Sequence, residues 1–268
     1  MSEAKVCVLN APGINCNEET AFAFELAGGQ PEQVHISELR SQNRNLDEFQ
    51  ILALPGGFSH GDDIAPGRIL GLEQRTQLSD QVNDFVETGN LVIGICNGFQ
   101  ILTESGLLPN GRTGIDAPKT ASLIDNKTAG FQCRWGRLVV EKSECVFASP
   151  EILGEHIELP SAHGEGQFLR RDEEAYDDLF DSGQVVFRYT DSAGKATEDF
   201  PDNPNGSPRG ITGICDRSGK ILGMMPHPER FVTPNQYVDY HRAKALGKTV
   251  TPHGLPLFKA MINYAKES

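Results

Sequence analysis

Short apolar runs that alternate with helical segments are the feature that most constrains how this chain can fold. In the first part of the chain these runs are bounded by Gly, Pro or Asn and read as strands, at residues 6–9, 34–36, 51–54 and 91–95. The spacing of apolar residues between and after them predicts helices at residues 17–27, 73–87 and 97–104. Such alternation requires right-handed crossovers and a parallel sheet.

The second half of the chain changes character. Its apolar runs are joined by turn-rich links and predict further strands, at residues 138–141, 185–189, 211–215 and 221–225, before a closing helix at residues 255–266. Links of this kind favour antiparallel pairing. The sequence therefore predicts an α/β fold with a mostly parallel central sheet flanked by helices and antiparallel additions in the second half.

The charge of the chain excludes several classes of partner. The 24 basic and 37 acidic residues give a net charge of −13, which argues against nucleic acid and against anionic membranes, because both need clustered Lys and Arg. No apolar run approaches the roughly 18 residues needed to span a bilayer. The first ten residues show no export signal, so a cytoplasmic location is expected.

The acidic surplus is concentrated in one stretch. Residues 171–202 contain three basic and ten acidic residues, which is −7 of the total −13. This stretch avoids every motif described below, so it is expected to be peripheral. A solvated face is favoured over a docking surface.

Residues 94–98, with the sequence GICNG, carry the strongest chemical signal. They follow a buried strand and precede a helix, which is the context of a nucleophile elbow with Cys96 as the nucleophile. The helix N-terminus would stabilise a thiolate and later an oxyanion. The alternative is a buried structural cysteine between packing glycines. The other cysteines lack this frame and are expected to be core or inert thiols without zinc-like spacing: Cys7, Cys16, Cys133, Cys145 and Cys215.

A thiolate enzyme also needs a base and a carboxylate that orients it. His227 and Glu229 are the best pair, because residues two apart in extended backbone point the same way. Pro226 and Pro228 favour that extension. The alternative is an ordinary surface turn.

A glycine-rich loop at residues 55–63 follows the predicted strand at residues 51–54. Adjacent glycines let backbone N–H groups approach a substrate, so Gly57 or Phe58 could supply an oxyanion donor beside that of Asn97. The His and Asp side chains of this loop are expected to be solvated, and no metal is expected at the site.

Taken together, these elements resemble class I (triad) glutamine amidotransferases, with Gln100 completing the elbow pattern. The resemblance is closer to one subfamily, the glutaminase subunits of phosphoribosylformylglycinamidine synthases. Six short motifs carry it in order along the chain: PGGFSHGD at 55–62, GICNGFQ at 94–100, FQCRW at 131–135, AHGEG at 162–166, NPNGSP at 203–208 and MMPHPER at 224–230. Gln167 and Gly136 depart from the subfamily pattern, and neither belongs to the triad.

The resemblance implies a role for each site residue. Cys96 is the nucleophile, His227 the base and Glu229 its orienter in the hydrolysis of L-glutamine to glutamate and ammonia. Gln100 would help to hold glutamine. Residues His163 and Glu165 would shape the glutamine pocket or contact the partner, against the alternative of an ordinary polar turn.

The resemblance also implies partners and domain organisation. A synthetase subunit would use the ammonia to convert formylglycinamide ribonucleotide to the amidine in purine biosynthesis, and a further small subunit is allowed. ATP and Mg²⁺ are expected in that synthetase, with no cofactor in this chain. Residues 1–268 are expected to form a single glutamine amidotransferase type 1 domain.

Three other functions remain open from the sequence. The chain could be a stand-alone cysteine hydrolase, a glutaminase that feeds a different synthetase, or a regulatory subunit with a vestigial site. The motifs outside the triad weigh against the first two, and the complete set of Cys96, His227 and Glu229 weighs against the third.

Overall fold

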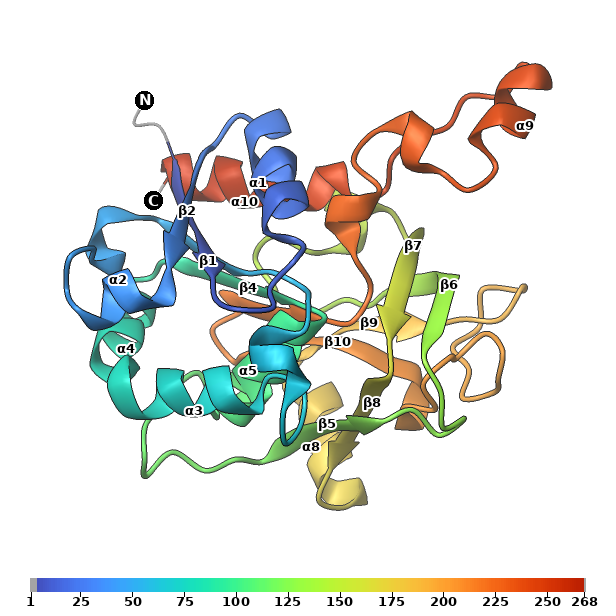
Figure 1. The fold of residues 1–268 in the computed structure, drawn as a ribbon. Helices are drawn as coiled ribbons and strands as arrows, with labels where there is room; N and C mark the ends of the chain where they lie inside the picture. Colours follow the sequence, from blue (N-terminus) through green and yellow to red (C-terminus); the bar gives the residue numbers. More distant parts are fainter. Residues whose placement is uncertain (1–3, 268) are drawn as a thin grey trace.

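A large mixed sheet forms the centre of the molecule in the computed structural model, which describes residues 4–267 (Figure 1). Its strands are β1 (Lys5–Asn10), β2 (Gln30–His35), β3 (Ile51–Leu54), β4 (Leu91–Ile95), β6 (Gln132–Val140), β7 (His156–His163), β9 (Val185–Tyr189), β10 (Ile211–Cys215) and β11 (Ile221–Met224). Their order across the sheet is β2-β1-β3-β4-β11-β10-β9-β6-β7. A separate antiparallel pair joins β5 (Ala121–Asp125) to β8 (Glu165–Arg170).

Helices cover both faces of the sheet. Helices α1 (Asn17–Leu26) and α10 (Leu255–Glu267) lie side by side on one face, whereas α3 (Arg68–Gln77), α4 (Ser79–Glu87) and α5 (Asn97–Glu104) lie on the other (Figure 1). The remaining α-helices are α2 (Ile36–Arg40), α6 (Leu107–Asn110), α7 (Pro150–Leu153), α8 (Glu173–Asp181) and α9 (Tyr240–Ala245). Within residues 4–267, no helix is both long and apolar enough to cross a bilayer.

The strand directions confirm the predicted fold class. Strands β2, β1, β3 and β4 pair in parallel, and β10, β9, β6 and β7 add antiparallel pairings. One strand differs from the expectation for the second half, because β11 pairs in parallel with β4. The β10–β11 hairpin reverses the chain and so gives β11 the direction of the first-half strands. Residues that follow β3, β4 and β11 therefore meet at one edge of the sheet.

Two predicted helices need correction. The single helix expected at residues 73–87 is a pair, α3 and α4, which meet at the buried Leu78. Leu78 has φ −121° and ψ 5°, so the backbone turns there although the apolar spacing continues. Asn17 is expected from its residue type to cap the helix that follows it. It is instead the first residue of α1, and Cys16 occupies the capping position.

The acidic stretch at residues 171–202 is only partly peripheral. It contains β9, an interior strand whose apolar side chains are buried between β10 and β6. Half of its acidic residues lie on the surface helix α8. There Arg209 bonds to Glu173 and Asp177 at 2.7 Å each, and Arg217 bonds to Asp178. Part of the charge is therefore paired on the surface, where each ion pair contributes less than about 1 kcal/mol.

Candidate active site

Three loops converge where β3, β4 and β11 end. They are the glycine-rich loop at residues 55–63, the turn that holds Cys96 and the turn that holds His227. Gly56 shows how closely they meet, because a Cβ atom at this position would lie 2.7 Å from Cε1 of His227. Only a glycine allows the first loop to pass under the imidazole. The sheet thus brings together residues that the sequence places far apart.

The backbone at Cys96 has the strained geometry of a nucleophile elbow. Its φ of +54° and ψ of −106° lie in a region that side chains other than glycine rarely adopt. A Cβ at Gly94 would lie 2.6 Å from the carbonyl oxygen of Gly98, and a Cβ at Gly98 would lie 1.9 Å from that of Leu54. Both flanking glycines are therefore required by close packing. A structural cysteine needs no such strain, so the geometry favours the elbow over that alternative.

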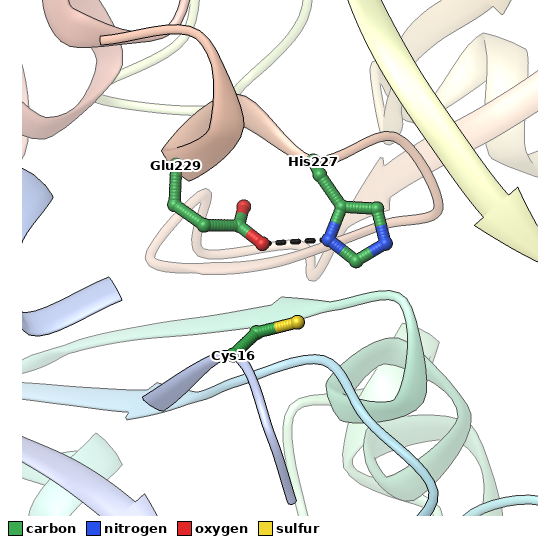
Figure 2. A group of neighbouring side chains, drawn as sticks. All are labelled: Cys16, His227 and Glu229. Carbon is green, nitrogen blue, oxygen red and sulfur yellow. Dashed lines mark hydrogen bonds and ion pairs between the residues drawn. The ribbon is translucent and has the colours of Figure 1, made fainter. Parts of the chain in front are cut away.

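His227 and Glu229 form a buried pair. Nδ1 of His227 lies 2.6 Å from Oε1 of Glu229, and the two side chains are 2% and 0% exposed (Figure 2). Burial opposes a charged imidazole, but the Glu229 carboxylate and the Cys96 side chain outweigh it, and the pKa of His227 is raised well above its usual value. The bond at Nδ1 leaves Nε2 without a hydrogen-bond partner among the described residues.

The backbone that presents this pair differs from the predicted extended segment. His227 is extended, with φ −103° and ψ 91°, but Glu229 lies in a short 3-10 turn, Pro228–Arg230. Proline is well suited to the first position of such a turn, where no N–H donor is needed. The proline that was expected to prolong the extension therefore starts a turn instead, and the turn still brings the two side chains together.

Two backbone N–H groups can serve an oxyanion. Asn97 is the first residue of α5, so its N–H has no partner within the helix, and no other described group accepts from it. The N–H of Gly57 is also free of any described acceptor. Phe58 does not fit the prediction, because its N–H donates to the carbonyl of Gly13 at 2.9 Å. The two N–H groups that are free to bind an oxyanion are therefore those of Asn97 and Gly57.

The Asn97 side chain organises the surrounding loops. Its Oδ1 accepts from the Ser59 N–H at 3.3 Å, and its Nδ2 donates to Oε1 of Gln100 at 3.0 Å. Gln100 in turn donates from Nε2 to the carbonyl of Glu165 at 2.6 Å. Gln100 is buried and engaged at both ends of its amide, so we infer that it holds the turn at residues 162–166 in place.

Two carboxyl groups lie beside this network. Nδ2 of Asn97 lies 3.4 Å from Oδ1 of Asp62, and burial raises the pKa of Asp62 to about 6. Burial, together with the charges of Asp125 and Asp62, also raises the pKa of Glu165. Desolvated carboxylates that share one region attract a cation, such as the ammonium group of an amino acid.

The turn at residues 162–166 is part of the site and not an ordinary polar turn. The thiol of Cys96 points to the carbonyl of Ala162 at 3.7 Å. His163 is 3% exposed and lies against Asn126, with Nδ1 3.2 Å from Oδ1. Burial, and then the charge of His227, lowers the pKa of His163 to about 3, so its imidazole is neutral. A residue this buried supports the pocket-shaping role and offers no surface to a partner.

Cys16 is the site residue that the sequence pattern missed. It lies directly before α1, and Nη2 of Arg230 donates to its Sγ at 3.0 Å. The Cys16 side chain interacts with the imidazole of His227, and its N–H donates to the carbonyl of Gly56 at 3.2 Å. The thiol expected to be inert therefore lies against the His227–Glu229 pair (Figure 2). No motif marks it, because the contact depends on how two loops pack.

Comparison with known proteins shows which proteins this chain is similar to. The chain is 42% identical to the phosphoribosylformylglycinamidine synthase subunit PurQ of Dehalococcoides mccartyi over the full length of both chains. It is 39% identical to the same subunit of Treponema denticola, with 97% of this chain and 98% of that protein covered. Among solved structures, PurLQS from Thermotoga maritima matches with a TM-score of 0.72 and 31% identity, covering 98% of this chain and 99% of that chain.

A more distant structure shows how general the fold is. A glutamine amidotransferase from Thermotoga maritima matches all of this chain with a TM-score of 0.57 at 15% identity, which is evidence for the fold alone. The model of the CobB/CobQ-like glutamine amidotransferase domain matches residues 3–265. With nearly the whole chain matched, the chain belongs to the CobB/CobQ-like glutamine amidotransferase family.

Proposed function

We propose that this chain hydrolyses L-glutamine and delivers the ammonia to a synthetase. One observation carries the proposal: a strained cysteine, Cys96, is held at the sheet edge where the buried His227–Glu229 pair also lies. This is the arrangement of a thiol nucleophile, its base and the orienting carboxylate. The family of the chain and its relatives named as PurQ support the same activity.

The proposed reaction proceeds through a thioester. The Cys96 thiolate attacks the side-chain carboxamide of glutamine, and the N–H groups of Gly57 and Asn97 hold the oxyanion. The high pKa of His227 keeps its imidazole protonated, so it can give a proton to the departing ammonia. The neutral imidazole then takes a proton from water, which attacks the thioester and releases glutamate. Glu229 holds Nδ1 throughout, so that Nε2 faces the reacting atoms.

The names of the relatives indicate which partner we propose for this chain. Two are named as subunits of phosphoribosylformylglycinamidine synthase, and the solved structure is named PurLQS. By this likeness the ammonia converts formylglycinamide ribonucleotide to the amidine on a synthetase subunit, with a further small subunit in the complex. ATP and Mg²⁺ would bind to the synthetase and no cofactor to this chain. We propose a cytoplasmic location and one domain over residues 1–268.

A reconstituted complex tests this function. We expect a tagged chain to capture an ATP-dependent synthetase from its native lysate, and the purified pair to form the amidine from glutamine. The isolated chain should hydrolyse glutamine slowly, because the synthetase is expected to complete the active arrangement. Ammonia release and amidine formation are measured with and without the companion. Rapid unstimulated hydrolysis, or a preference for peptides over glutamine, would contradict the proposal and favour a stand-alone hydrolase.

The half-buried carboxyl of Asp62 predicts a pH dependence of glutamine binding. Its pKa of about 6 means that it is ionised above pH 6 and neutral below, so its attraction for the ammonium group of glutamine fades as the pH falls through 6. We expect KM for glutamine to rise over that range in the native chain. Asp62→Asn should raise KM roughly fivefold at neutral pH, for a partly screened interaction of about 1 kcal/mol, and should weaken the pH dependence.

The neighbouring Asp63 supplies a matched control, because it is exposed and Asp63→Asn changes the net charge equally. Steady-state glutaminase assays between pH 5 and 8 would measure KM and kcat for both variants. Equal KM values for the two variants, or a change confined to kcat, would show that Asp62 does not bind the substrate ammonium group.

A further inference from the structure

Cys16, His227 and Glu229 form a compact cluster of three different metal-binding side chains. One ligand atom from each side chain lies within 4.8 Å of the other two, and all three side chains are buried. The cluster joins the start of α1 to the turn that follows β11. Figure 2 shows the thiol pointing toward the hydrogen-bonded edge of the His227–Glu229 pair. The proposed hydrolysis uses Cys96 as its nucleophile and does not explain a second thiol here.

A thiolate, an imidazole and a carboxylate suit zinc well. Zinc binds these groups at about 2.0–2.3 Å in a tetrahedral arrangement, often with three protein ligands and one open position. Ligand atoms around such an ion lie roughly 3.3–3.7 Å apart. The ligand atoms of the cluster lie within 4.8 Å of one another, so an ion would have to draw them about 1 Å closer together. The spacing in the sequence predicts no such site, because the fold alone brings Cys16 to the pair.

The charge of the cluster also permits a divalent cation. Metal binding displaces the proton of a coordinating thiol and that of a coordinating imidazolium, so His227 would be neutral while Cys16 and Glu229 together carried two negative charges. The guanidinium of Arg230, 3.0 Å from Sγ, offsets one of them. The remaining negative charge favours a dication, although less strongly than without the arginine. Glu229 keeps a second oxygen, Oε2, without a hydrogen-bond partner among the described residues.

We propose that this cluster binds a zinc-like divalent cation and that the bound ion switches the glutaminase off. An ion held by His227 and Glu229 removes the imidazole from proton transfer and displaces the carboxylate that orients it. The Cys96 thiol would then lack its acid and base. The binding half of this proposal stands on the cluster alone, whereas the inhibition rests on the proposed function.

Cobalt(II) tests the binding directly, since it occupies zinc sites and gives an ultraviolet charge-transfer band when a thiolate binds it. We expect the band on titrating the purified chain with Co²⁺, and expect Zn²⁺ to remove it by competition. The band should persist in Cys96→Ala and vanish in Cys16→Ser. The exposed Cys133 provides a matched control, because Cys133→Ser should leave the band intact. A band that depends on Cys96 or on Cys133 would overturn the proposed site.

Inhibition by zinc tests whether the bound ion switches off the glutaminase. In the reconstituted complex, Zn²⁺ should inhibit amidine formation from glutamine and leave the reaction with ammonia unchanged. Addition of a chelator should restore the glutamine-dependent activity. Cys16→Ser should raise the inhibition constant at least about tenfold, because removing even an outer-shell partner costs roughly 10–100-fold in metal affinity. An unchanged inhibition constant in folded Cys16→Ser, or in Cys16→Ala, would refute the switch. The cobalt assay needs no turnover, so it separates failure of this site from failure of the glutaminase proposal.

Discussion

Replacing Cys96 with alanine is expected to abolish amidine formation from glutamine and to leave the reaction with ammonia intact. Loss of the nucleophile should lower the glutamine-dependent kcat by a factor on the order of 10⁴–10⁶, since removing the nucleophile of a triad enzyme removes nearly all of its chemistry. Alanine keeps the Cβ and occupies the same backbone position, so the strain at φ +54° is unchanged. A loss of activity in this variant is therefore caused by the missing sulfur atom and not by a change in the backbone of the elbow.

Both activities would be measured on the same reconstituted complex, with either glutamine or an ammonium salt as nitrogen donor. Cys133→Ala is the matched control, because Cys133 is exposed and lies outside the site. Its two activities should equal those of the native complex. If Cys96→Ala kept its glutamine-dependent activity, the thioester mechanism would be wrong. If it lost both activities, the substitution would have disrupted the complex, and Cys96→Ser would be needed to separate chemistry from assembly.

The elements that the sequence predicts best are those whose local pattern has one structural solution. A continuous apolar run such as Leu91–Ile95 is expected to be buried on both faces, and the structure makes it the interior strand β4, between β3 and β11. The glycines around Cys96 predict the elbow for the same reason, because only glycine fits where the structure shows backbone contacts at Gly94 and Gly98. Steric constraints between residues close in the chain can thus be predicted from the sequence.

The direction of β11 and the position of Cys16 depend instead on long-range packing. The run at residues 221–225 is apolar whether it pairs in parallel or antiparallel. Its direction is settled only by the pairing with β4, which runs from Ile221 opposite Val92 to Met224 opposite Ile95. Cys16 reaches the site because the backbone bridge between Ile14 and Gly57 brings its loop onto the glycine-rich loop. Neither contact leaves a periodic signal in the sequence. The motifs therefore predict Cys96, His227 and Glu229 as site residues but do not single out Cys16.

Glu229→Gln is expected to lower the glutamine-dependent kcat by about 10⁴, the loss that follows when the carboxylate of a triad is replaced by its amide. The amide can donate to Nδ1 of His227 where the carboxylate accepts, so the imidazole would carry its proton on Nε2, the wrong nitrogen. Removal of the charge also lowers the pKa of His227, because the Glu229 carboxylate is the largest influence that raises it. The ammonia-dependent reaction should be unchanged.

The pH profile separates this electrostatic role from a merely structural one. Protonation of the departing ammonia needs the imidazolium, which is lost as the pH rises through the pKa of His227. The alkaline limb of kcat/KM should therefore move to lower pH in Glu229→Gln. The exposed Glu174 supplies the matched control, as Glu174→Gln should shift neither limb. Glu229→Asp keeps the charge, so it should recover part of the rate and restore the alkaline limb. A loss of kcat with an unshifted limb would mean that Glu229 only fills space beside the imidazole.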